Sequence, residues 1–196
     1  MLCLGLLVFG WALLRHLPIV AADAFLAGSW TRAAKALTMV GGSLAMAGTL
    51  APIPSESAGG WRRHANATEP FVRFGAICLG SFLIIAGLQH FKFTSLVVAL
   101  IPSWFPGDAT WWARFAGVAL ITGGLGLLFG RTAVIAGLMT GSMIFSWFWI
   151  VHLPRMLTSV SDGIAVFEAL AFSGIALVVA GALSKVRQSG KVPTAY

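Results

Sequence analysis

Charged side chains are scarce in this sequence of 196 residues, because Asp, Glu, Lys and Arg together make up only 10% of it. Soluble domains carry about 25%, so this chain has too few ionic groups to cover a surface that faces water. Hydrophobic residues supply 58% of the sequence, and the mean hydropathy is +0.90. The shortage of charge predicts an integral membrane protein with one transmembrane domain over residues 1–196.

Cysteine is also rare, and the two residues of this type, Cys3 and Cys78, cannot form a disulfide framework. They are expected to act as small apolar side chains. The alternative is that the two thiols form a pair, if the first and third helices are neighbours. No dinucleotide-binding motif and no metal-ligand spacing occurs, so no metal site is predicted. The net charge of +7 comes from basic residues that punctuate apolar runs, which indicates membrane topology and not nucleic-acid binding.

Long apolar runs are what the sequence does contain, and crossing a bilayer takes about 20 such residues. The runs predict an all-α, polytopic transmembrane bundle of about six helices. Their approximate ranges are 2–20, 34–52, 72–90, 112–129, 132–151 and 163–183. Arg15 and His16 shorten the first run, and Pro18 is expected to end it.

Two connections between these runs are long and differ in composition. The segment from Pro54 to Pro70 is polar and predicts an exposed loop. The segment from Phe91 to Trp111 mixes aromatic and aliphatic residues with prolines. That mixture predicts a segment that lies in the membrane interface or re-enters it.

Two of the predicted helices begin alike, which suggests an internal repeat. Placing Trp30–Gly48 over Trp112–Gly130 aligns a Trp-x-Arg-x-Ala start and a later Gly-Gly pair. The second helix then corresponds to the fourth, and the first to the third. This predicts a parallel repeat of two-helix units.

Helix parity gathers the ionisable residues, because the first, third and fifth helices end on the side where the second, fourth and sixth begin. The residues that this places on one face are His16, Asp23, Arg32, His90, Asp108, Arg114, His152, Asp162 and Glu168. Lys and Arg are divided almost equally between the two faces, so the positive-inside rule hardly distinguishes the two possible orientations in the membrane. We favour cytoplasmic termini in a bacterial inner membrane.

Several motifs together resemble those of the DoxX-like membrane proteins, and the resemblance is best from about residue 71 to 183. The motifs are Gly87-Leu88-Gln89-His90-Phe91, Ile101-Pro102-x-Trp104-x-Pro106-Gly107, Trp112-Ala113-Arg114-Phe115-x-Gly117, Gly123-Gly124-x-Gly126 and His152-Leu153-Pro154-Arg155. The resemblance implies a small helical bundle. Some relatives are linked to oxidation of thiols or sulfur compounds with quinone as acceptor, and others to assembly of membrane complexes.

The candidate ligand-binding residues on the polar face are His90, Arg114, His152, Glu168 and Trp112. An ionised carboxylate inside a helix, such as Glu168, must be paired, be protonated or face a wet cavity. The two histidines have ordinary alternatives as interfacial rings at helix ends. Arg114 could snorkel to lipid phosphates, and Trp112 fits an aromatic belt.

Three functions are compatible with these residues and motifs. The first is an accessory protein that binds a quinone, a lipid or another small amphiphile on the histidine face. The second is the membrane subunit of an oxidoreductase that passes electrons from a thiol or sulfur compound to quinone. The third is a structural subunit of a larger membrane complex. The lipid bilayer is a partner in all three, and quinone is the candidate cofactor.

Overall fold

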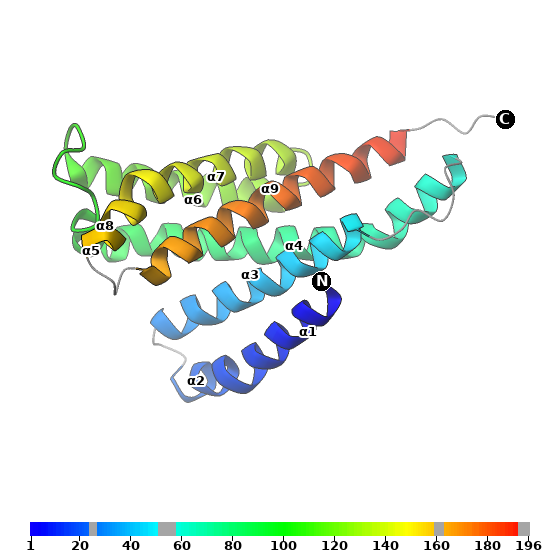
Figure 1. Cartoon of the computed structure of the whole chain (residues 1–196), viewed down its shortest axis with the longest axis horizontal. Helices are drawn as coiled ribbons and strands as arrows, with labels where there is room; N and C mark the ends of the chain where they lie inside the picture. Colours follow the sequence, from blue (N-terminus) through cyan, green and yellow to red (C-terminus); the bar gives the residue numbers. More distant parts are fainter. Residues whose placement is uncertain (24–26, 51–57, 159–162, 192–196) are drawn as a thin grey trace.

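The computed structural model describes residues 1–23, 27–50, 58–158 and 163–191, and every regular element in them is a helix. The all-α prediction is therefore confirmed. The elements form three hairpins, which lie side by side in Figure 1. The first contains α1 (Leu2–Trp11), η1 (Ala12–His16), α2 (Leu17–Ala22) and α3 (Ala27–Leu50). The second contains α4 (Ala58–Lys92), α5 (Thr94–Val98) and α6 (Ala109–Leu128). The third contains α7 (Ala133–Trp147), η2 (Phe148–His152), α8 (Leu153–Thr158) and α9 (Gly163–Lys191).

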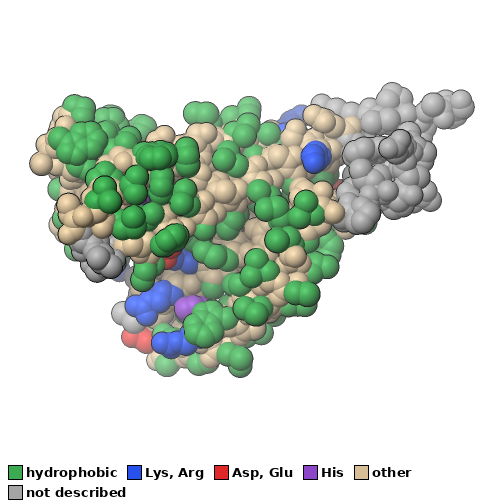
Figure 2. Space-filling view, viewed as in Figure 1, with side chains coloured by type: hydrophobic (Ala, Val, Ile, Leu, Met, Phe, Trp, Pro, Cys, Tyr) green, Lys and Arg blue, Asp and Glu red, His purple; other side chains and the backbone are tan. Residues whose placement is uncertain are grey.

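Five helical stretches in the described residues are long and apolar enough to cross a membrane. They are Leu2–Ala22, Ala67–Lys92, Ala109–Leu128, Ala133–Thr158 and Gly163–Gln188. The predicted helix at 34–52 coincides with α3 as far as Leu50, residues 51–52 lie outside the described residues, and α3 is not among the five. Large apolar side chains cover the outside of the bundle (Figure 2), with Leu14 and Phe167 more than two-thirds exposed. These features indicate an integral membrane protein.

The prediction that Pro18 ends the first helix is wrong, because the helix continues to Ala22. Proline has no N–H to donate to the carbonyl four residues earlier, and its ring presses on that carbonyl. The turn before Pro18 therefore widens into the π-helix η1, in which the N–H of Leu17 donates to Ala12 O, five residues back. The same adjustment precedes Pro154, where Leu153 N–H donates to Phe148 O in η2.

The predicted loop between Pro54 and Pro70 is also wrong in its second part, because α4 begins at Ala58 and contains Pro70. Alanine, arginine and glutamate in this stretch are good helix formers. Pro54 itself lies outside the described residues.

The central helix of the bundle is α4, which packs against α3, α6 and α9. Glycines set its closest approaches. A Cβ on Gly75 would lie 2.7 Å from Gly41 O of α3, and one on Gly124 of α6 would lie 2.6 Å from Gly80 O. Distances this short leave no room for any side chain, so glycine lets the backbones meet. The predicted repeat of the second and fourth helices stays a prediction.

Candidate functional site

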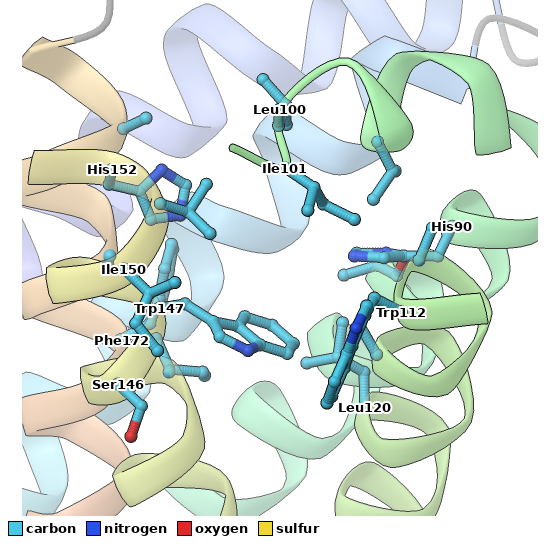
Figure 3. Close-up of a pocket in the computed structure, with 18 of the residues that line it drawn as sticks. His90, Leu100, Ile101, Trp112, Leu120, Ser146, Trp147, Ile150, His152 and Phe172 are labelled. Carbon is cyan, nitrogen blue, oxygen red and sulfur yellow. The ribbon is translucent and has the colours of Figure 1, made fainter. Parts of the chain in front are cut away.

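A cavity of about 430 Å³ lies between the second and third hairpins. The end of α4 and the start of α6 form one wall, and η2 with the start of α9 forms the other (Figure 3). Most of the lining is apolar, including Phe82, Leu120, Ile144 and Phe172. The polar groups are therefore few, and their positions decide what the cavity can bind.

His90 reaches this cavity from the last turns of α4, and its hydrogen bond fixes the tautomer. The ring nitrogen Nδ1 lies 2.8 Å from Ala86 O. A carbonyl oxygen only accepts, so Nδ1 carries the proton and Nε2 of the neutral ring carries a lone pair. Nε2 has no hydrogen-bond partner among the described residues. Because the ring points into the cavity (Figure 3), His90 presents a hydrogen-bond acceptor there.

Glu168 lines the cavity from α9 and forms an ion pair with Lys35 of α3. The Nζ and Oε2 atoms lie 2.6 Å apart, and the two side chains are 30% and 31% exposed. Both side chains line the cavity. The pairing offsets the cost of holding a carboxylate away from bulk water. Oε1 of Glu168 has no partner in the described part of the chain, so it is a second acceptor at this wall.

Aromatic rings flank the two acceptors. Trp147, the last residue of α7, has its ring centroid 6.4 Å from that of His90 on the opposite wall. Trp112 of α6 also lines the cavity, and Figure 3 shows the indole of Trp147 extending from the other wall across the cavity toward that of Trp112. Their neighbours Trp111 and Trp149 are more than half exposed and do not line it. A flat ring bound in the cavity would have an indole beside it on which to stack.

The segment after α5 covers one end of the cavity and contributes Leu100, Ile101 and Phe105 to its lining. Two hydrogen bonds hold this segment in place. Trp112 Nε1 donates to Pro106 O at 2.7 Å, and Arg155 Nη1 donates to Ala99 O at 3.2 Å. The predicted interfacial segment at 91–111 thus folds back over the bundle as a cover.

Four of the five predicted site residues meet at this cavity, namely His90, Trp112, His152 and Glu168. Arg114 does not line it and is exposed on the outside of α6. The reason is helical geometry, because positions two residues apart, such as Trp112 and Arg114, point about 200° apart. Asp162, also predicted on this face, lies outside the described residues.

Asp108 has a local structural role, since its carboxylate accepts from the N–H groups of Thr110 and Trp111 and caps α6. No group of three or more His, Cys, Asp or Glu side chains that could hold a metal ion occurs within the described ranges.

The comparison with family models gives one match, over residues 79–184, to a family described as a domain of unknown function (DUF8561). The chain belongs to this family. No curated protein matches it, and no solved structure does. The matched region contains both helical walls of the cavity except for Lys35, which α3 supplies from outside it.

Lys35 and Trp147 line the cavity but are not among the predicted site residues. The pairing of Lys35 with Glu168 depends on the register of α3 against α9, which is not visible in sequence. A helix that ends at 151, as predicted, places Trp147 near the interface, where an aromatic belt explains it. The helix instead continues to Thr158, so Trp147 lies well inside it.

Proposed function

We propose that the protein binds a small amphiphile, a quinone or a lipid, in the cavity between its second and third hairpins. The observation that carries the proposal is the convergence of His90, His152 and Glu168 with two indoles on one mostly apolar cavity. A volume of about 430 Å³ lies within the usual range of ligand sites, about 300–1,000 Å³. The polar groups would hold the head of the ligand, and the apolar walls its ring or chain.

A quinone is the ligand that the aromatic lining favours, because a planar head could stack on the indole of Trp112 or of Trp147. The resemblance to DoxX-like proteins supports the same choice. It also supports the second candidate function, a membrane subunit of a thiol or sulfur-compound:quinone oxidoreductase. In that case a partner subunit of the membrane complex supplies the electrons. For location, we propose a bacterial inner membrane with cytoplasmic termini.

Tryptophan fluorescence tests the proposal, because an excited indole is quenched by a quinone in contact with it. The purified protein in detergent would be titrated with a ubiquinone analogue that has a short tail. We expect saturable quenching. Trp147→Phe should remove much of the saturable part, and Trp149→Phe, its exposed neighbour, should leave that part intact.

The pair Trp112→Phe and Trp111→Phe provides a second test of the same design on the opposite wall. If the ligand is a lipid and not a quinone, the quinone analogue would cause no quenching. Titrating the protein with that lipid would then raise the melting temperature of the wild type more than that of His90→Phe. Quenching that is non-saturable, or equal in the inner and outer tryptophan variants, would refute binding of quinone in this cavity.

A further inference from the structure

The sequence Trp-x4-His-Leu-Pro occurs twice, at Trp11–Pro18 and at Trp147–Pro154. Both copies fold into the same unusual structure, a five-residue π-helix that ends at the histidine. The first residue of each π-helix is buried, Ala12 in η1 and Phe148 in η2. The first copy lies outside the region matched by the family model.

The correspondence extends from the motifs to the helix packing of both hairpins. Keeping the spacing of the two motifs aligns Gly5 of α1 with Gly141 of α7. A Cβ on Gly5 would meet Ser43 and Leu44 of α3, and one on Gly141 would meet Ala176 and Leu177 of α9. Two adjacent residues of α3 thus correspond to two adjacent residues of α9. The first and third hairpins are therefore packed alike. In each, a glycine of the hairpin's first helix contacts the equivalent turn of its second helix.

The same register along α3 and α9 aligns Lys35 with Glu168 and Gly42 with Ile175. Each of these residues contacts its own counterpart. Lys35 pairs with Glu168, and a Cβ on Gly42 would lie 2.6 Å from Ile175. Equivalent residues touch each other only where they lie on a two-fold axis. The first and third hairpins are thus related by an approximate two-fold axis between α3 and α9, which run side by side in the same direction in Figure 1.

This symmetry maps one wall of the cavity onto the surface of the first hairpin. All lining residues of the third hairpin have counterparts in the first, and six of them are compared here. In order, Trp147, Ile150, Val151, His152, Ala165 and Glu168 correspond to Trp11, Leu14, Arg15, His16, Arg32 and Lys35. The indole and the imidazole are kept, and two apolar lining residues, Val151 and Ala165, are replaced by arginines.

Apart from Lys35, which lines the cavity itself, no residue of the duplicated wall is among those that line the cavity in the described part of the chain; we call these other residues the outer wall. Trp11 is 57% exposed, and Arg15 and Arg32 are exposed as well. Neither arginine has an ion-pair or hydrogen-bond partner within the described residues. Figure 2 shows cationic side chains and a histidine gathered over α2 and the start of α3, at the edge of a hollow. Asp23 is the acidic residue at the same end of the hairpin.

The two arginines also lie at similar depth in the hairpin. Arg15 precedes the end of α2 at Ala22 by about two turns, and Arg32 follows the start of α3 at Ala27 by between one and two turns. From there both guanidinium groups can extend to the polar layer along their aliphatic stems. Arginine binds phosphate with paired N–H donors, and a bilayer offers phosphate at this depth.

We propose that the outer wall, made by Trp11, Arg15, His16 and Arg32, is a binding site for the headgroup of an anionic phospholipid. The aliphatic chains would run along the apolar face of α1 and α2. The proposal is independent of the ligand in the cavity, because the two sites share no residue of this set.

Native mass spectrometry and thermal shift in mixed micelles test the site. Phosphatidylglycerol is compared with phosphatidylcholine of the same chains, and inorganic phosphate is a separate arm. We expect retention of phosphatidylglycerol, with affinity falling about tenfold in Arg15→Gln and in Arg32→Gln. Arg15→Lys should lose less, because it keeps the charge. Arg131→Gln removes a charge from the other end of the bundle and should change nothing.

Three results would overturn the proposal. One is equal retention of the two phospholipids by the wild type. Another is equal losses in Arg131→Gln and the two outer-wall variants, which would indicate a general charge effect. The third is a full effect of inorganic phosphate alone, which would show an anion site without lipid. Circular dichroism of each variant checks that the helices are formed.

Discussion

The first and third hairpins have the same local structure and different surroundings. Each has a glycine packed on the second helix, a π-helix forced by a proline, and a Trp–His pair at the π-helix. The third hairpin faces α4 and α6 across a cavity, whereas the matching face of the first is open. The comparison shows that the π-helix positions an indole and a histidine. The neighbours of that pair decide whether they line a partly enclosed cavity or an outer surface.

The substitutions allowed on the two faces follow from this difference. In the third hairpin these positions face the cavity and are occupied by apolar residues such as Val151 and Ala165, because an unpaired cation there would be costly. On the outer face of the first hairpin, arginine can reach water or phosphate from the corresponding positions. Glu168 and Lys35 are the exception, because each compensates the charge of the other across the axis.

The largest expected difference between the hairpins is the loss of stability when a larger side chain replaces the glycine at the helix contact. A Cβ on Gly141 would lie 3.0 Å from Leu177, whereas one on Gly5 would lie 3.5 Å from Leu44. We expect Gly141→Leu to lower the free energy of unfolding by about 3 kcal/mol and Gly5→Leu by about 1 kcal/mol. Equilibrium unfolding in mixed micelles measures both. Equal losses would contradict the view that the third hairpin is the more tightly packed copy.

The ion pair that joins the two hairpins should give the next largest effect. Lys35→Met and Glu168→Gln each remove one partner and should cost about 2 kcal/mol, because the other is left uncompensated in a partly enclosed site. The double variant should cost less than the two single costs combined. The pair Arg73–Glu69 is the control, since Arg73 is 66% exposed and Arg73→Met should cost less than about 0.5 kcal/mol. Strict additivity at Lys35 and Glu168 would show that the pair contributes nothing.

The smallest effect concerns the two prolines and is measured by binding. Replacing Pro154 with alanine restores an N–H, so η2 can return to an ordinary α-helical turn. Trp147 and His152 would then no longer face the cavity together. We expect Pro154→Ala to weaken binding of the quinone analogue about fivefold. Pro18→Ala makes the same change in the first hairpin and should leave that binding unchanged, so equal effects would break the distinction between the two copies.

The fold and the position of the polar face could be predicted from sequence because both depend on quantities that sequence contains. Span length and apolar content give the helices, and parity places His90, His152 and Glu168 at one end. Arg114 does not line the cavity for a reason also present in sequence, since it lies two positions from Trp112 on one helix. The repeated Trp-x4-His-Leu-Pro string was equally visible there.

Other features depend on packing and could not be predicted. The pairing of Lys35 with Glu168 requires the register of two helices that are far apart in the chain. The behaviour of Pro18 and Pro70 depends on whether the surrounding turns can widen or continue, and residue type alone does not decide that.

The length of α4 also has a practical consequence for topology. Its 35 residues extend about 52 Å at 1.5 Å per residue, well beyond the roughly 30 Å of a hydrocarbon core. Its first turns lie at the end of the bundle away from the cavity (Figure 1). An antibody would therefore reach an epitope inserted before Ala58 from one side of the membrane only. The cavity would then lie towards the opposite side of the membrane.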